Sequence, residues 1–540
     1  MLKTYTWPHY AYRPAPQGQP RVPLVVVGAG PVGLCCAIDA ALRGQAVVLV
    51  DEDDTVSVGS RGLCYAKRTL EIFDRLGVGD AVVERGVTWN VGRTFHRERE
   101  VFAFNLQPEP GHRRPGMVNL QQYHLEQMLV ERALTLPLID LRWRHKVVAV
   151  AQEASSTQLE VETPDGRYTL HCDWLIAADG AKSGVRRMLG LDMEGRVFQD
   201  RFLIADVLLS GEPFAADCTE RRFWFEPGFH PQQSALMHRE ADNVWRMDFQ
   251  LGWDADPELE KQPDRVGARI RAALDSQGFA PIGFDLEWVS VYTFQCRRMA
   301  RFRHGRVFFV GDSAHQVSPF GARGANSGVQ DADNLIWKLD LVMRGLAGEA
   351  LLDSYDAERG AAADENLLNS TRATDFMTPK SRASRLMRDA VLTLAAEQPF
   401  ARALVNSGRL SVPTHFSDSP LNTPDEDEFA GWMRPGAPAD DAPLPDEAWL
   451  LPQLGLDFTL LEFADDAGEA ARIEPSAADR IPLRRLVLPP AGLAAERYDA
   501  RPGTAYLFRP DQHVAARWRR PTPEGVRQAL ARAVAIEVVP

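Results

Sequence analysis

The start of the chain alternates between short strand-like apolar runs and one helical stretch. Residues 24–27 form an apolar run, and Gly28-Ala29-Gly30-Pro31-Val32-Gly33 follows at once. A helical stretch then covers 34–43 and is followed by Gly44, a residue that favours a helix end. A second apolar run covers 47–50. Strand, glycine turn, helix and strand in this order predict a βαβ unit and a parallel sheet.

The pattern of hydrophobic and polar residues changes in the middle of the chain. Residues 141–178 are strand-like and end in a buried strand at 174–178, whereas 196–295 alternate and are rich in aromatic residues. We interpret 196–295 as an antiparallel sheet inserted into the first domain. A short buried strand at 307–310 and a glycine-containing loop precede a long helix that ends near Met343. Its apolar residues fall at steps of three and four and form one stripe.

The C-terminal part has a separate organisation. Residues 411–447 hold seven prolines and an acidic run at 425–428, which is typical of a linker. Strands are expected at 457–463, 483–488 and 504–508, with a closing helix at 524–534. The predicted domains are therefore 20–195 and 296–410, interrupted by the sheet at 196–295, then the linker at 411–447 and a small α/β domain at 448–540.

Composition narrows the class of protein. The 540 residues carry 61 Lys and Arg against 74 Asp and Glu, a net charge of −13, which argues against nucleic-acid and anionic-membrane partners. We find no apolar run long enough to span a membrane and no secretory h-region in the first twenty residues, and therefore expect a cytoplasmic protein. The six cysteines lack CxxC spacing, so we expect buried thiols and no metal site.

The glycine turn predicts a dinucleotide site. Gly28 makes the tight turn, Gly30 lets a pyrophosphate approach, and Gly33 lets the helix that starts at Pro31 lie close to the sheet. Asp51 follows Gly33 by eighteen residues, at the end of the second strand, where a ribose-hydroxyl acceptor is required. Glu52 is the neighbouring candidate, although its side chain should point to the other face. An acid here favours FAD or NAD over NADP.

Two later loops also follow buried strands. Asp179-Gly180 ends the strand at 174–178, and Gly311-Asp312 ends the strand at 307–310. The carboxyl ends of parallel strands are where α/β sheets hold ligands. The second loop continues to Gly328, with glycines that let the backbone run close to a flat ligand, and the following helix aims its positive end at that ligand.

Together the three segments resemble a known family. GAGPVGL with VDEDD, DGAKSGVR, and VGDSAHQVSPFGARGANSGVQDADNLIWKL are similar to the fingerprints of single-component FAD-dependent aromatic hydroxylases with the p-hydroxybenzoate hydroxylase fold. Within that family the likeness is greatest to 3-(3-hydroxyphenyl)propionate hydroxylase-like enzymes. The resemblance covers about 20–410 well. It implies a Rossmann-like FAD-binding domain with an inserted, mostly antiparallel substrate sheet, and a C-terminal thioredoxin-like domain without redox cysteines.

The resemblance also implies roles for residues of the fingerprints. The ADP half of FAD would lie on Gly28, Gly30, Pro31, Gly33 and Asp51. The phosphate, ribityl and nicotinamide-side contacts would come from Arg61, Gln122, Asp179, Gly180, Gly311 and Asp312. The isoalloxazine would be bordered by Pro319, Gly324, Ala325 and Asn326.

The implied reaction uses NADH or NADPH and O2. The nicotinamide would reduce FAD, and a flavin C4a-hydroperoxide would transfer OH to a phenolic ring, ortho to its hydroxyl. The substrate would be a small aromatic, with an aromatic acid preferred, and a homodimer is expected. The protein's tasks would be to favour phenolate and to exclude water.

Candidate residues for these tasks lie on the inserted sheet and in the loop before the long helix. The candidates are Arg246, His238, Tyr292 and Arg323. Arg246 lies in an apolar strand and needs a partner if buried, either a substrate carboxylate or one of Asp248 and Glu240. Arg323 would either recognise an anionic substrate or be solvated. His315, near Gly311-Asp312, is expected to position its loop.

Two other functions fit the same fold. A polyketide-type oxygenase or a Baeyer–Villiger monooxygenase would keep the cofactor and change the chemistry. A non-catalytic escort protein would use the fold as a scaffold, and would be expected to have lost the glycines that the three segments still contain.

Overall fold

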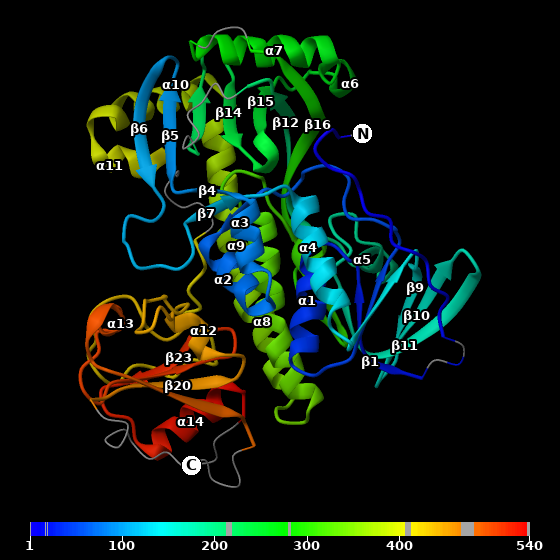
Figure 1. The fold of residues 1–540 in the computed structure, drawn as a ribbon, viewed down its shortest axis with the longest axis vertical. Coiled ribbons are helices and arrows are strands. Elements are labelled where there is room, and N and C mark those ends of the chain that lie inside the picture. Colours follow the sequence, from blue (N-terminus) through cyan, green and yellow to red (C-terminus); the bar gives the residue numbers. More distant parts are fainter. Residues whose placement is uncertain are drawn as a thin grey trace.

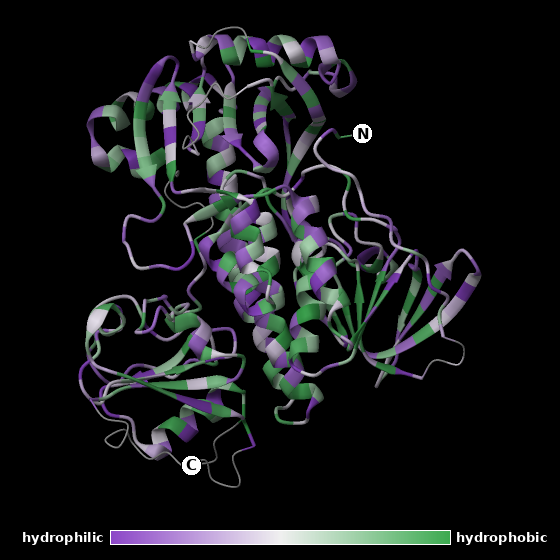
Figure 2. Cartoon of the chain, in the orientation of Figure 1, coloured by the Kyte–Doolittle hydropathy of each residue, from purple (hydrophilic) through white to green (hydrophobic). Residues whose placement is uncertain are grey.

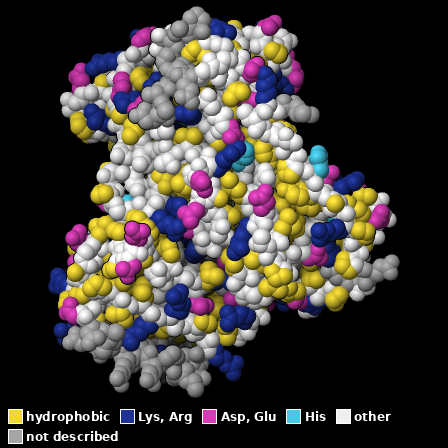
Figure 3. Space-filling model, in the orientation of Figure 1, with side chains coloured by type: hydrophobic (Ala, Val, Ile, Leu, Met, Phe, Trp, Pro, Cys, Tyr) yellow, Lys and Arg dark blue, Asp and Glu magenta, His cyan; other side chains and the backbone are white. Residues whose placement is uncertain are grey.

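The computed structural model describes residues 2–16, 18, 20–211, 219–278, 282–405, 412–465 and 480–536. Figure 1 shows a central α/β body crossed by long helices, a second sheet at one end, and the C-terminal unit, coloured orange to red, at the other. In the described parts of the chain, no helix combines the length and the apolar character that crossing a membrane requires. Positive and negative side chains are interspersed on the face in Figure 3.

The central sheet confirms the predicted βαβ unit. Strand β1 pairs in parallel with β2 on one side and with β11 on the other. The residues of β1 that reach the core are Leu24, Val25 and Val26, each at most 1% exposed. Such strands are covered on both faces, and Figure 2 colours them mostly green. The strands are β1 (Val22–Val27), β2 (Val47–Asp51), β8 (Ile139–Trp143), β9 (Lys146–Gln152), β10 (Thr157–Thr163), β11 (Gly166–Ala177), β17 (Arg303–His304) and β18 (Val307–Phe309).

Helices and a small sheet surround this body. Helix α1 packs against α8 and α4, and α8 packs against α9. The helices are α1 (Pro31–Leu42), α2 (Lys67–Leu76), α3 (Gly79–Arg85), α4 (Gln122–Leu134), α5 (Gly184–Met188), α8 (Gly324–Met343), α9 (Ala350–Met377), α10 (Arg382–Glu397) and α11 (Pro399–Arg402). The small sheet has the order β3-β7-β4. Its strands are β3 (Cys64–Ala66), β4 (Val87–Trp89) and β7 (Met117–Asn119).

The second large sheet extends beyond the range expected for it. Its order is β19-β16-β12-β15-β14-β13-β5-β6, so strands from 91–105 and from 315–316 join those from the expected range 196–295. The pairing is antiparallel except between β13 and β5. The strands are β5 (Val91–His96), β6 (Arg99–Asn105), β12 (Glu194–Leu209), β13 (Arg221–Phe225), β14 (Ser234–Arg239), β15 (Val244–Leu251), β16 (Phe284–Arg298) and β19 (His315–Gln316). Below we call it the substrate sheet.

One face of the substrate sheet is closed by a helix. Helix α7 (Pro263–Ser276), preceded by α6 (Pro257–Glu260), buries Val266 and Ile270 against that face. Met247 and Phe249 of β15 belong to the same apolar cluster. Because side chains alternate along a strand, Arg246 and Asp248 lie on the opposite face.

The C-terminal unit forms a four-stranded sheet of order β21-β20-β22-β23. The strands are β20 (Phe458–Phe463), β21 (Leu483–Leu488), β22 (Ala505–Phe508) and β23 (Val514–Trp518), with helices α12 (Leu450–Leu454), α13 (Gly492–Arg497) and α14 (Pro523–Ala533). The three expected strands and the closing helix are therefore present. Strand β23 had no counterpart in the sequence prediction.

The proline-rich segment does not behave as the expected linker. Its described part, 412–447, packs on the C-terminal sheet: Thr423 N donates to Ala515 O at 2.8 Å, and Gly436 N donates to Val514 O at 2.8 Å. Asp425, in the acidic run, pairs with Arg517 at 2.6 Å. The described part of this segment therefore packs along the C-terminal sheet through backbone hydrogen bonds and the Asp425–Arg517 pair.

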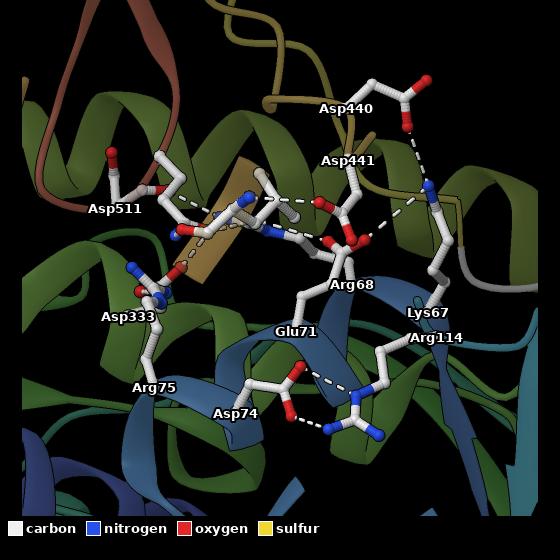
Figure 4. Close-up of polar contacts among 12 residues, drawn as sticks. Lys67, Arg68, Glu71, Asp74, Arg75, Arg114, Asp333, Asp440, Asp441 and Asp511 are labelled. Atoms are coloured by element: carbon white, nitrogen blue, oxygen red, sulfur yellow. Dashed lines mark hydrogen bonds and ion pairs between the residues drawn. The ribbon is translucent and has the colours of Figure 1, made fainter. Parts of the chain in front are cut away.

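Buried polar contacts join this unit to the central body (Figure 4). Arg68 of α2 donates to Asp511 O at 2.6 Å, and Lys67 donates to Asp440 Oδ1 at 3.0 Å. Arg509 of the C-terminal unit donates to both carboxylate oxygens of Glu358 on α9, at 2.5 and 3.0 Å. Charges that are this deeply buried require such partners.

Candidate functional site

The glycine turn leaves an open, positively polarised helix end. Gly28 has φ +103°, and a Cβ there would lie 2.5 Å from Ala178 O. At Gly33 a Cβ would overlap the carbonyl oxygen of Gly28, whereas at Gly30 it would meet nothing within 4 Å. Helix α1 begins at Pro31 without a side-chain cap. The N–H groups of its first turn are therefore left for an anionic ligand.

Asp51 lies against this turn. Its carboxylate accepts hydrogen bonds from Ala29 N at 2.5 Å and Asp53 N at 2.9 Å. Burial raises the pKa of Asp51 to about 6. Glu52 points elsewhere and pairs with Lys146 at 2.7 Å on the surface. The structure therefore brings Asp51, but not the Glu52 side chain, to the predicted dinucleotide site.

Asp179 and Gly180 lie beside the same turn. Asp179 Oδ2 accepts from Val185 N at 2.9 Å. Its Oδ1 is buried and has no hydrogen-bond partner among the residues that the structure describes. Gly180 has φ +72°, and no atom lies within 4 Å of a Cβ built there. A buried acceptor without a partner, next to open space, is suited to a ligand hydroxyl or N–H group.

Asp312 follows the end of β18 and has an exposed side chain. Desolvation raises the pKa of its carboxyl group, and the charges of His315 and Arg61 oppose that rise. Gly311 N donates to Asp331 Oδ2 at 2.9 Å and fixes the turn before Asp312.

The start of α8 completes this side of the site. No side-chain hydrogen bond caps the helix, which leaves the N–H groups around Gly324 and Ala325 for a ligand. Pro319 is exposed at the edge of the loop. Asn326 holds the helix to β3, since its Oδ1 accepts from Ala66 N at 2.8 Å and its Nδ2 donates to Cys64 O at 2.8 Å.

The loop at 57–63 forms a wall next to that helix end. Gln122 Oε1 accepts from Gly62 N at 2.7 Å, and Gln122 Nε2 donates to Ser57 Oγ at 3.0 Å. Glu126 Oε2 accepts from Ser57 N at 2.5 Å. The Gln122 amide, expected at the ribityl chain, thus fixes the loop that carries Arg61.

Residues 5–10, which are rich in aromatic side chains and which we call the N-terminal strap, pack against residues 55–57 at the start of this loop. Trp7 Nε1 donates to Ser57 O at 3.1 Å, and Thr55 Oγ1 donates to Pro8 O at 2.6 Å. The ring of Tyr5 lies 4.3 Å from that of Tyr123 on α4. The strap therefore clamps the chain between Asp51 and Arg61.

Facing the loop, the substrate sheet presents Arg246. Arg246 Nε and Nη2 donate to the two carboxylate oxygens of Asp206 on β12, at 2.7 and 2.9 Å, and Nη2 also donates to Ser60 O at 2.6 Å. Glu240 Oε1 lies 3.1 Å from Arg246 Nε. Asp206, which the sequence did not single out, is the main partner, and Glu240 is the one expected candidate that contacts the guanidinium.

Several buried polar atoms around Arg246 have no hydrogen-bond partner within the described ranges. They are Ser60 Oγ, Tyr65 Oη, His238 Nδ1 and Nε2, Glu240 Oε2 and Asp248 Oδ1. Buried polar groups are normally hydrogen-bonded, so such a concentration indicates a place for polar groups of a ligand. We call these residues and Arg246 the polar cluster.

Comparison with known proteins places this geometry in a family. A family model described as "FAD binding domain" matches residues 21–370, more than half of the chain. The chain belongs to this FAD-binding family of flavin-dependent monooxygenases.

Relatives of the monooxygenase are similar along most of its length. It is 30% identical to "6-methylpretetramide 4-monooxygenase" of Streptomyces rimosus, over 96% of this chain and 94% of the relative. It is 28% identical to "3-(3-hydroxy-phenyl)propionate/3-hydroxycinnamic acid hydroxylase" of Mycolicibacterium smegmatis, over 71% of this chain and 66% of the relative, just under two thirds of that protein. The flavin-dependent monooxygenase PieE, solved with FAD and substrate, has the same fold, with TM-score 0.79, 24% identity and coverage of 96% and 100% of the two chains.

The residues present in this chain fit FAD. Two uncapped helix ends, the unfilled space at Gly30 and the orphaned Asp179 oxygen lie where the three fingerprints converge. Gly28, Gly33 and Asp51 would hold the adenosine side of the cofactor, and Asp312 with the start of α8 would hold the flavin side.

The other expected residues fall into three groups. His238 belongs to the polar cluster, and Tyr292 lies near it, since Arg246 and Arg61 both lower the pKa that burial raises. Arg323 is not solvated, because it is 4% exposed and donates to Asn366 at 3.0 Å. His315 pairs with Asp331 at 2.6 Å and so positions its loop as expected.

The cysteines of the monooxygenase are free wherever they are described. Cys35, Cys36, Cys172 and Cys296 are buried, and Cys64 is half-buried beside the polar cluster. Cys218 lies outside the described residues. Burial raises the pKa of the Cys35 and Cys36 thiols, which makes them inert, as the sequence indicated.

Proposed function

We propose that the protein uses FAD, NAD(P)H and O2 to hydroxylate a phenolic ring ortho to an existing hydroxyl. The observation that carries the proposal is the polar cluster, whose orphaned atoms are buried and which is joined to the loop at 57–63 by the hydrogen bond from Arg246 to Ser60 O. When bound, FAD supplies the redox and oxygen-activating chemistry. The chain's own residues hold the ring, exclude water and handle the phenolic proton.

We further propose a substrate without a carboxylate, in place of the aromatic acid that the sequence favoured. Arg246 was the expected carboxylate partner, but Asp206 neutralises it through two hydrogen bonds and Glu240 lies against it. An anion there would displace a well-formed buried ion pair, which is costly. Neutral donors and acceptors remain on His238 and Tyr65, and they suit the hydroxyl and keto groups of a fused-ring phenol.

The relatives support a polyketide-like substrate, the alternative that the sequence left open. The chain aligns over 94% of the 6-methylpretetramide 4-monooxygenase, and over less of the phenylpropionate hydroxylases. Either NADH or NADPH suits the role of reductant, because the three fingerprint segments account for only one dinucleotide, FAD. If ketones rather than phenols stimulate NAD(P)H oxidation, the reaction would instead be a Baeyer–Villiger oxygenation of a ketone.

The test is substrate-stimulated NAD(P)H oxidation by purified holoprotein, with hydrogen peroxide measured in parallel. The panel pairs neutral fused-ring phenols with hydroxylated aromatic acids of similar size. We expect neutral phenols to raise the oxidation rate at least tenfold with little peroxide. A larger, well-coupled response to the acids would overturn the substrate class. Peroxide alone with every phenol would overturn the reaction.

For the C-terminal unit we propose a thioredoxin-like fold without redox activity. Strand β20 pairs in parallel with β21 and antiparallel with β22, which pairs antiparallel with β23, and α14 follows. A parallel pair joined edge to edge with an antiparallel pair is the arrangement of thioredoxin-like sheets. No cysteine occurs beyond Cys296, so the unit's role is structural.

We also propose a homodimer built through the α10 and α11 face. Exposed apolar side chains gather there: Leu386 is 62%, Met387 69% and Phe400 66% exposed. Exposed apolar side chains gathered on one face suit an interface with another chain. Mass in solution tests the assembly, and M387E is expected to shift a dimer toward monomer. A wild-type protein that is monomeric at micromolar concentration would contradict it.

A further inference from the structure

Asp248 has an unmet hydrogen-bonding requirement on the open face of the substrate sheet. It follows Arg246 by two residues on β15, and its neighbours across the ladder are Leu236 on β14 and Ile204 on β12. Its Oδ1 is buried and has no hydrogen-bond partner in the described chain. A buried carboxylate oxygen flanked by apolar residues costs free energy unless something else donates to it.

His238 has the same unmet requirement on the same face. Neither ring nitrogen has a partner in the part of the chain that the structure describes. Burial, together with the charges of Arg221 and Arg246, holds the pKa of His238 well below its ordinary value. The ring is therefore neutral and offers one donor and one acceptor.

The register sets the spacing of the two groups. His238 lies directly opposite Arg246, and Asp248 is two residues farther along β15. Diagonal neighbours of this kind are about 7–8 Å apart. A hydroxyl-bearing ring edge can lie between them and contact both, since neither group is tied to the protein through the atoms named above.

The charges around Asp248 tune its carboxyl group. Burial is the largest effect and raises its pKa to about 7, with Asp206 adding to the rise and with Arg246 and Arg221 opposing it. Glu240 and Cys64 also face it, and Asp248 in turn raises the pKa of both. A group that is about half ionised near neutral pH is well placed to take up and release a proton.

We propose that Asp248 accepts the proton of the substrate's hydroxyl group while His238 hydrogen-bonds the same ring, an assignment that rests on the proposed function. The phenolic O–H bond breaks, its electron pair stays on oxygen as phenolate, and the proton bonds to Oδ1. The negative charge moves from carboxylate to phenolate within the field of Arg246 and Arg221, so the net charge of the cluster does not change. Asp248 returns the proton to water before the next turnover.

The test compares D248N with D200N. Asp200 is a matched control: it lies on the same sheet, is 1% exposed, and is bound by Lys380 and Trp253 away from the cluster. FAD content and substrate-free NAD(P)H oxidation report folding of each variant. The substrates are an ordinary phenol and a nitro-substituted phenol that is already ionised at pH 8.

We expect the hydroxylation rate of the wild type to rise with pH through about 7, because Asp248 must be ionised to accept a proton. D248N should lose this rise and about 10²-fold in rate on the ordinary phenol, a usual contribution of general-base catalysis. It should keep near-wild-type rates on the ionised phenol, which needs no base. D200N should keep the wild-type profile.

Three outcomes decide the matter. A D248N enzyme with the wild-type rate and pH profile overturns the assignment while leaving the proposed function intact. Equal losses on both phenols assign Asp248 a structural or binding role and also overturn it. A wild-type enzyme that hydroxylates neither phenol overturns the proposed function itself.

Discussion

Arg509 is the residue through which the C-terminal unit is tied most deeply to the central body. Its guanidinium is buried between Asp511 and Glu358, and Lys338 also donates to Glu358, at 2.7 Å. The two positive charges, on Arg509 and Lys338, therefore balance the two negative charges, on Asp511 and Glu358. Although burial alone would raise it, Arg509 and Lys338 hold the pKa of Glu358 below its ordinary value.

R509M would leave one buried negative charge without compensation. Removing one partner of a buried ion pair costs about 3–5 kcal/mol, and methionine retains most of the side-chain volume. R527M is the control, because the Arg527–Glu524 pair on α14 is exposed and such pairs contribute about 0.2–1 kcal/mol. The free energies of unfolding of the two variants should thus differ by several kcal/mol, although each variant removes one arginine.

Guanidinium unfolding followed by tryptophan fluorescence measures the difference. Trp337 is buried 5.4 Å from the Arg509 guanidinium, so its emission reports opening of this interface. R509M should shift the first transition to markedly lower denaturant, and R527M should leave it in place. Coincident transitions for the two variants would refute the view that the buried cluster holds the unit in place. Because the pKa of Glu358 is lowered, the stability it contributes should also fade as pH drops below about 4.

Three further outcomes concern the binding of the cofactor. G30A should fold normally and bind FAD at least tenfold more weakly, because its Cβ would fill only the space left for phosphate. G33A should fail to fold, because its Cβ would overlap the backbone of Gly28. FAD titration and thermal melting separate the two effects, and a stably folded G33A would contradict the second expectation. FAD affinity should rise as pH increases through about 6, because ionised Asp51 is the better hydroxyl acceptor, and D51N should abolish that rise in a pH series of titrations. W7A should speed FAD release in stopped-flow fluorescence by loosening the loop at 52–57, and an unchanged release rate would exclude a role for the strap in cofactor retention.

The cofactor side of the site was predictable because its signals are local. Gly28, Gly30 and Gly33 act through backbone geometry within one turn, and Asp51 follows at the end of the next strand. Each of these residues lies at the turn, helix start or strand end that the sequence pattern predicts, and its contact with FAD stays a prediction. Asn326 is the instructive exception, since its side chain is used to hold β3 and only its backbone remains for a ligand.

The substrate side was not predictable because its contacts depend on strand register. Asp206 and Arg246 are 40 residues apart and meet only because β12 pairs with β15. The sequence indicated that a buried Arg246 needs a partner, but it could not identify which acid provides it. Strands β5 and β6 joined the same sheet from 91–105, where no pattern indicated it. The acidic, proline-rich segment at 411–447 was misread because composition does not reveal that Asp425 pairs with Arg517.

We propose above that this chain, loaded with FAD, inserts an oxygen atom from O2 into a neutral phenolic ring. Mass spectrometry of the product formed under isotopically labelled O2, with the phenol that best stimulates NAD(P)H oxidation, tests it directly. We expect a product that carries one labelled oxygen ortho to the original hydroxyl. Unlabelled product, labelled oxygen found only in peroxide, or an ester formed from a ketone would contradict it.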